Sequence, residues 1–205
     1  MKVYVIGDSI SLQYGPYLKE YLNGIMEYSR KEGDEEAMLN LDKPQGSNGG
    51  DSSMVLSFME AKAASGGIEA DLLLLNCGLH DIKTNPATGE KQIPIELYEK
   101  NLRAIVKTVA KMKTRLVWMR TTPCDENVHN QKGMSFHRFS SDCNKYNDAA
   151  DRIMKEAFIP VIDLHKFTIN LGNELFCDHV HFQEHVRQKQ ASFLAGWLSL
   201  WKERQ

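Results

Sequence analysis

The sequence predicts an α/β fold in which a parallel sheet is covered by helices on both faces. Short apolar runs alternate with segments of helical periodicity along the chain, and the run at 72–77 is apolar at nearly every position. Such a continuous run is typical of a strand buried on both faces, and strand–helix alternation is typical of parallel α/β folds. The chain has 205 residues. That is the length of one domain, so we expect a single domain over residues 1–205.

Five short apolar runs are the candidate strands of this sheet. In chain order they lie at 3–6, 37–41, 72–77, 116–119 and 161–163. Each is too short for a helix of ordinary length and is separated from the next by a longer segment. We therefore expect a sheet of about five strands.

Helical patterns fill the segments between these runs. The first is expected from Leu12 to about 29, with Pro16 tolerated if it lies in the first turn. Others are expected from Asp51 or Ser52 to about 64, and over 146–157. Two more have an apolar face at helical spacing, carried by Tyr98, Leu102, Ile105, Val109 and Met112 and, near the end of the chain, by Val186, Phe193, Trp197 and Trp201.

The charge balance argues against nucleic acid and membrane surfaces as partners. Lys and Arg total 25 and Asp and Glu total 27, for a net charge of −2 at pH 7. Both kinds of partner attract clustered positive charge, whereas the basic residues here are spread along the chain. No stretch approaches the roughly 20 apolar residues of a membrane span.

The cysteines and the start of the chain indicate a reducing compartment. Four scattered cysteines form no CxxC pair, so we expect reduced thiols. The apolar run after Lys2 stops at Gly7, which is too short for the core of a signal peptide. We expect a cytoplasmic protein, or a secreted or periplasmic one if a leader has been removed.

Three polar loops follow predicted strands and are expected to meet at one edge of the sheet. They lie at 7–9, 46–50 and 78–81. In parallel α/β sheets, ligands bind beyond the carboxyl ends of the strands. The first loop places Ser9 near the start of a helix, where backbone N–H groups and the helix dipole favour negative charge.

A serine nucleophile needs a base, and the base needs a carboxylate that orients it. Asp178 and His181 lie three residues apart, so that one turn can bring the two side chains together. His179 and His185 compete for the role of base.

Four short motifs resemble the blocks of the GDSL, or SGNH, hydrolase family. GDSIS at 7–11 resembles its first block, GGDSS at 49–53 its second, GLHD at 78–81 its third and DHVH at 178–181 its last. They occur in the family's order across most of the chain. The resemblance implies a three-layer α/β/α sandwich of the flavodoxin-like type with a short parallel sheet, and ester hydrolysis without a metal or other cofactor.

The resemblance also implies a role for each matched residue. Ser9 is the nucleophile, His181 the general base, Asp178 its partner and Gly50 a donor to the oxyanion. The departure is His80, which stands where the family usually has Asn. A neutral imidazole can also donate a hydrogen bond, so we expect His80 to act as an oxyanion donor in its place.

Other polar residues have structural interpretations. Asp8 is expected to cap the first helix, and Asp81 to anchor its loop through backbone hydrogen bonds. The loop over 124–139, which carries His129 and His137, is long for a compact domain and is either a wall over the substrate or a solvated loop.

Two alternatives remain open from the sequence. Cys177, Asp178, His179, His181 and His185 are crowded together, which would suit a metal-dependent hydrolase or a metal-binding module. His80 could instead mark a non-catalytic binding protein with this fold. We favour an esterase that removes a small acyl group, acetyl first, from a small-molecule or carbohydrate ester. Asn76, His80, Asn85 and Gln183 would suit a sugar, and a lipid ester or thioester is the second choice.

Overall fold

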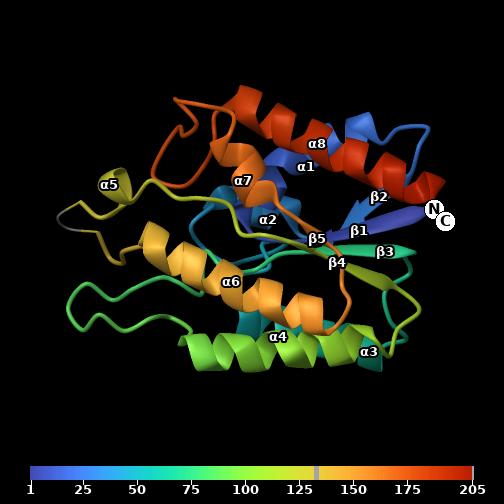
Figure 1. The fold of residues 1–205 in the computed structure, drawn as a ribbon, viewed down its shortest axis with the longest axis horizontal. Helices are drawn as coiled ribbons and strands as arrows, with labels where there is room; N and C mark the ends of the chain where they lie inside the picture. The colour runs from blue at the N-terminus through green and yellow to red at the C-terminus, as the bar shows by residue number, and fades with distance from the viewer. Residues whose placement is uncertain (132–133, 205) are drawn as a thin grey trace.

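The computed structural model describes residues 1–131 and 134–204 and contains a five-stranded, all-parallel sheet (Figure 1). The strand order is β2-β1-β3-β4-β5. The strands are β1 (Lys2–Ile6), β2 (Glu27–Arg30), β3 (Leu72–Leu75), β4 (Arg115–Met119) and β5 (Val161–Ile162). The predicted α/β class and the parallel sheet are confirmed.

Helices cover both faces of the sheet and complete three layers (Figure 1). On one face α1 packs on α8, and on the other α4 packs on α3 and α6. The helices are α1 (Ser9–Tyr21), α2 (Asp34–Leu39), α3 (Ser52–Ala64), α4 (Ile95–Val109), α5 (Glu126–His129), α6 (Ser140–Glu156), α7 (Leu164–Ile169) and α8 (Glu184–Glu203). Among the residues described, no helix is long and apolar enough to cross a membrane.

The prediction of the second strand was wrong. Residues 37–39 belong to α2, and residues 40–41 follow its end. The first helix ends at Tyr21 instead of continuing to 29. The strand is β2, an edge strand that pairs only with β1. Its sequence is Glu-Tyr-Ser-Arg, because an edge strand with half-exposed side chains needs no apolar run.

The position of Pro16 was also predicted wrongly. Because α1 begins at Ser9, Pro16 lies inside the helix and not in its first turn. A proline there removes one backbone hydrogen bond and crowds the preceding turn. The carbonyl that loses its donor is that of Leu12, and Arg30 Nη1 donates to the neighbouring Ser11 carbonyl at 3.0 Å.

The core lies on both sides of β3, whose four leucines are completely buried. The predicted apolar face of α4 is confirmed, since Tyr98, Leu102 and Ile105 are fully buried. On α8, Val186 is buried, whereas Phe193, Trp197 and Trp201 are half-buried and pack against the rim of the core. All four cysteines are free thiols.

Candidate active site

The turn between β1 and α1 places Ser9 at the first position of a helix. Asp8 caps the helix, as the sequence indicated: its Oδ1 accepts from the Ile10 N–H at 3.0 Å. Gly7 is required by close packing, since a Cβ there would lie 2.8 Å from the Ser11 Cβ. Ser9 is therefore held at the carboxyl edge of the sheet, where the helix dipole favours negative charge.

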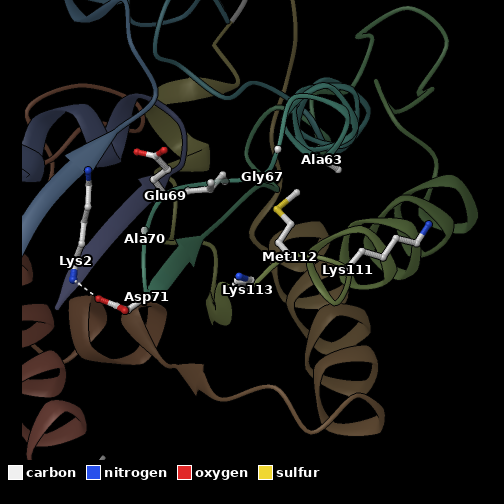
Figure 2. A pocket seen from close by; sticks show the side chains of 11 residues that line it. Lys2, Ala63, Gly67, Glu69, Ala70, Asp71, Lys111, Met112 and Lys113 are labelled. Atoms are coloured by element: carbon white, nitrogen blue, oxygen red, sulfur yellow. Dashed lines mark hydrogen bonds between the residues drawn. The ribbon is translucent and has the colours of Figure 1, made fainter.

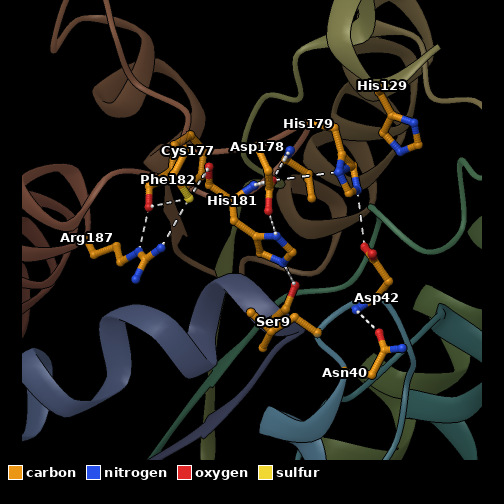
Figure 3. Close-up of polar contacts among 12 residues, drawn as sticks. Ser9, Asn40, Asp42, His129, Cys177, Asp178, His179, His181, Phe182 and Arg187 are labelled. Carbon is orange, nitrogen blue, oxygen red and sulfur yellow. Dashed lines mark hydrogen bonds and ion pairs between the residues drawn. The ribbon is translucent and has the colours of Figure 1, made fainter. Parts of the chain in front are cut away.

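Ser9, His181 and Asp178 form one chain of hydrogen bonds (Figure 3). Ser9 Oγ lies 2.8 Å from His181 Nε2, and His181 Nδ1 lies 2.7 Å from Asp178 Oδ2. A carboxylate can only accept, so Nδ1 carries the imidazole proton. Nε2 is then the acceptor for the Ser9 hydroxyl proton. The structure brings together the three residues that the sequence singled out from opposite ends of the chain.

The Asp178 carboxylate is fixed and ionised by its surroundings. Burial would raise its pKa, but hydrogen bonds from the Val180 N–H, the His181 N–H and the His181 side chain outweigh burial and lower it. The two backbone bonds measure 2.8 and 2.7 Å to Oδ1. One turn thus holds the carboxylate and aligns the imidazole that follows it.

Gly50 lies beside the site in the loop before α3. Its φ is +72°, a conformation that favours glycine. The neighbouring Gly49 N–H donates to the Gly7 carbonyl at 2.9 Å, which ties this loop to the turn that carries Ser9. The Gly50 N–H donates to Asn48 Oδ1 at 3.0 Å. To donate to an oxyanion, it would have to exchange this partner for the substrate oxygen.

His80 is buried with 3% of its surface exposed, and its Nδ1 has no hydrogen-bond partner among the described residues. Burial, followed by the positive charges of Lys83 and Arg138, holds the pKa of His80 well below its ordinary value. The imidazole is therefore neutral at neutral pH and carries one N–H.

Asp81 anchors the same loop, as expected from the sequence. Its Oδ1 accepts from the Ser52 N–H at 2.9 Å, at the start of α3. Burial raises the pKa of Asp81 to about 7, against the opposing effect of the bonds from Ser52. The loops at 50–52 and 78–81 are thereby joined beneath the site.

The two competing histidines do not contact Ser9. His179 Nε2 lies 3.2 Å from Asp42 Oδ1 (Figure 3), and His185 is exposed in the first turn of α8. Among the described residues, no three His, Cys, Asp or Glu side chains are grouped so as to hold a metal ion. The Cys177 thiol instead donates to the carbonyls of His181 and Phe182.

The segment 124–139 contains α5 and several buried side chains. Its residues 132 and 133 lie outside the described part of the chain. His129 is buried beside Arg138, whereas His137 pairs through its backbone with Thr84. Sequence reasoning missed Arg138 and Asp42, because neither lies in a recognisable motif.

A hollow of about 650 Å³ lies at the opposite, amino edge of the sheet (Figure 2). Lys2, Asp71, Lys111 and Lys113 are among the residues that line it, and it includes none of the site residues named above. The Lys2 N–H donates to the Asp71 carboxylate at 2.6 Å.

Comparison with solved structures supports the fold assignment. The acetyl xylan esterase AlAXEase has a TM-score of 0.71 and 18% identity, over 97% of this chain and 100% of its own. A putative acylhydrolase from Bacteroides fragilis has a TM-score of 0.68 and 13% identity, over 100% and 88%. A member of the lipolytic protein G-D-S-L family from Veillonella parvula has a TM-score of 0.65 and 15% identity, over 96% and 97%.

At these identities the likeness establishes a shared fold, and it confirms the fold that the four motifs implied. Comparisons with protein-family models and with curated proteins find no match.

Proposed function

We propose that the protein is a serine esterase in which residues 1–205 act as one domain. The observation that carries the proposal is the hydrogen-bonded chain Ser9–His181–Asp178 at the carboxyl edge of the sheet. A hydroxyl bonded to an imidazole, which is in turn bonded to a carboxylate, is the arrangement that activates serine for acyl transfer. It uses only side chains of this chain.

The reaction begins when Ser9 Oγ attacks the ester carbonyl carbon and His181 Nε2 takes the hydroxyl proton. Asp178 stabilises the imidazolium that results. His181 then returns the proton to the departing alkoxide, which leaves as the alcohol, and an acyl-enzyme remains on Ser9. Water attacks this ester while His181 takes its proton. His181 then gives that proton to the departing Ser9 Oγ, which restores the hydroxyl and releases the carboxylic acid.

In the tetrahedral intermediate the former carbonyl oxygen carries a negative charge, which hydrogen-bond donors must stabilise. We assign this role to the Ser9 N–H at the start of α1, the Gly50 N–H and the neutral imidazole of His80. Gly50 would turn from Asn48 to the substrate as the oxyanion forms.

A small acyl group, acetyl first, is the substrate we propose, carried by a small molecule or a carbohydrate. Ser9 is 5% exposed and His181 3%, so the ester must reach a nearly buried nucleophile. One protein of the same fold is an acetyl xylan esterase, which favours the same choice. The Asn76 amide bonds Met119 and Thr121 within the protein, and it adds no support for a sugar.

The test combines labelling with a series of nitrophenyl esters. A serine-reactive phosphonate should modify Ser9 and abolish hydrolysis, and EDTA should leave hydrolysis unchanged. Acetyl esters should react faster than octanoyl esters. A preference for long chains would overturn the small-acyl assignment, while loss of activity in EDTA would favour the metal-dependent alternative. An inert protein with unlabelled Ser9 would favour a binding protein.

A further inference from the structure

Arg138 is a buried cation outside the four motifs. Arg138 is only 2% exposed. Within the described residues, no ion pair joins its guanidinium to a carboxylate. Burying a charge without a counter-ion is costly unless hydrogen bonds replace the lost water. Within the described residues the guanidinium makes two such bonds, one to the loop at 78–81 and one to His129 in Arg138's own segment.

The first bond reaches the loop that carries His80. Arg138 Nε donates to the Leu79 carbonyl at 2.7 Å. Leu79 immediately precedes His80, whose Nδ1 has no hydrogen-bond partner among the described residues. The position of the imidazole therefore depends on its packing and on the backbone of the 78–81 loop, which Arg138 helps to hold.

The second bond reaches His129. Arg138 Nη1 lies 2.7 Å from His129 Nε2, and since a guanidinium only donates, Nε2 is the acceptor. Burial and then the charge of Arg138 lower the pKa of His129 to about 4. His129 is thus a neutral acceptor with its proton on Nδ1, and the contact is attractive.

His129 in turn supports the loop that carries the base. Its ring packs edge-on against His179, with centroids 4.4 Å apart (Figure 3). The Asp125 N–H donates to the His179 carbonyl at 3.0 Å. The side chain of Asn130 bonds both the N–H and the carbonyl of Arg138, so the arginine's own backbone is held as well.

We propose that Arg138 is a positioning residue for ester hydrolysis: its guanidinium holds the Leu79–His80 backbone in a fixed place relative to the loop that carries Asp178 and His181. The inference rests on the proposed function. It predicts that Arg138 acts on the reaction through His80, without contacting the substrate.

A double-mutant cycle tests this directly. R138K keeps the charge but cannot bond the Leu79 carbonyl and His129 together with a planar fork, and R138M removes charge and bonds. We expect kcat for nitrophenyl acetate to fall about 10-fold in R138K and about 100-fold in R138M, with KM little changed, as for a displaced catalytic group. In a His80→Ala background the same changes should lower kcat less than about threefold, because coupled residues are not additive.

Arg120→Met is the matched control, because Arg120 is also largely buried but is bonded to Asp163, Asp151 and Asp148. It should lower Tm without lowering kcat. If R138M does not fold, as judged by circular dichroism, the cycle is run with R138K. The inference would be overturned if the Arg138 substitutions lowered kcat equally in the wild-type and His80→Ala backgrounds. It would also be overturned if kcat were unchanged in R138K and R138M.

A second readout does not depend on turnover. The imidazole NMR signals of His80, assigned by their absence in His80→Ala, should shift and broaden in R138K and stay unchanged in Arg120→Met. Unchanged His80 signals in R138K would contradict the positioning role. Failure of the proposed function would appear differently, as a wild-type protein whose Ser9 is neither labelled by phosphonate nor active.

Discussion

The two edges of the sheet differ in the burial of their polar side chains. At the carboxyl edge, Ser9, His80, Asp81 and His181 are each buried, and most of their polar atoms are bonded within the protein. At the amino edge the hollow of about 650 Å³ is open, and its lysines 111 and 113 are exposed to solvent (Figure 2).

This difference explains why we place the proposed chemistry at the carboxyl edge and not at the open hollow. A catalytic group must be held in one position and shielded from water before the substrate arrives, and both conditions require burial and hydrogen bonds. Exposed lysines around an open hollow satisfy neither condition. Changes at the carboxyl edge should therefore affect hydrolysis, whereas changes at the amino edge should not.

Ser9→Ala should have the largest effect. It removes only the hydroxyl that lies against His181, so kcat should fall about 10⁴-fold or more with little change in Tm. Lys113→Ala, at the amino-edge hollow, should leave kcat within about twofold, since nothing there is arranged for catalysis. Hydrolysis assays and thermal melts measure both. Near-normal turnover in Ser9→Ala would exclude Ser9 as the nucleophile.

Variants of His80 should separate the donor role from the residue type. His80→Asn should keep or raise kcat, because a neutral amide can donate where the imidazole does. His80→Ala should lower kcat about 100- to 1000-fold, the usual effect of removing one oxyanion donor. Steady-state kinetics at pH 7 are the measurement. If the Asn variant were as inactive as Ser9→Ala, His80 would have a different essential task.

Gly50 and Gly24 form a matched pair, with φ of +72° and +75°. Gly24 lies between α1 and β2 at the amino edge, where an added Cβ would meet nothing within 4 Å. Gly24→Ala should therefore lower the free energy of unfolding by about 1 kcal/mol from backbone strain alone.

Gly50→Ala adds a steric conflict, since its Cβ would lie 2.8 Å from the Pro44 Cβ. The loss should exceed that of Gly24→Ala by about 1–3 kcal/mol, and kcat should fall as well. Urea titrations and kinetics on both variants provide the comparison. Equal stability losses with full activity would show that the loop before α3 tolerates the side chain.

Asp81→Asn should have the smallest effect, confined to the pH dependence of stability. Because burial raises the pKa of Asp81 to about 7, the folded chain keeps a proton that the unfolded chain loses near pH 4. Asp81 therefore makes stability fall as pH rises from about 4 to about 7. Asparagine has no such proton, so the Tm of Asp81→Asn should fall by a few degrees less than the wild-type Tm over this pH range.

Melting curves between pH 4 and 8 test this prediction. Some fall should remain in the variant, since burial also raises the pKa of Asp8. An unchanged slope would mean that Asp81 is ionised in the folded protein throughout this range.

The strands that the sequence identified are those with apolar side chains. The four leucines of β3 are buried on both faces, and the apolar runs at 3–6, 116–119 and 161–163 coincide with strands. The edge strand β2 was not predicted, because its side chains are partly exposed and it can contain polar residues such as Glu27 and Ser29. Residues 37–41 resembled a strand because most of them are apolar. Met38 and Leu39 lie in α2, however, and are 56% and 82% exposed.

The candidate site was predictable for a related reason. Motifs that follow parallel strands reach the same edge, so Ser9 and His80 could be expected near one another before any coordinates were known. Gly50 was expected there from a strand at 37–41 that the structure does not contain, and its loop reaches this edge through the bond from the Gly49 N–H to the Gly7 carbonyl. Asp178 and His181 share one turn, and their spacing alone favoured the pair. Arg138 has no comparable signal, because its partner Leu79 lies 59 positions away and contributes only a carbonyl.

The sequence by itself determined the apolar strands, the helices with an apolar face, the polar loops and the order of the motifs, because periodicity and turn chemistry act over a few residues. It did not determine the edge strand β2. Only the tertiary structure decided which histidine meets Ser9, that the Gly50 N–H is bonded to Asn48, and that Arg138 bonds Leu79 and His129. Those contacts depend on where whole loops pack. Burial then sets the charge of His80 and Asp81, and no local pattern in the sequence encodes burial at a single side chain.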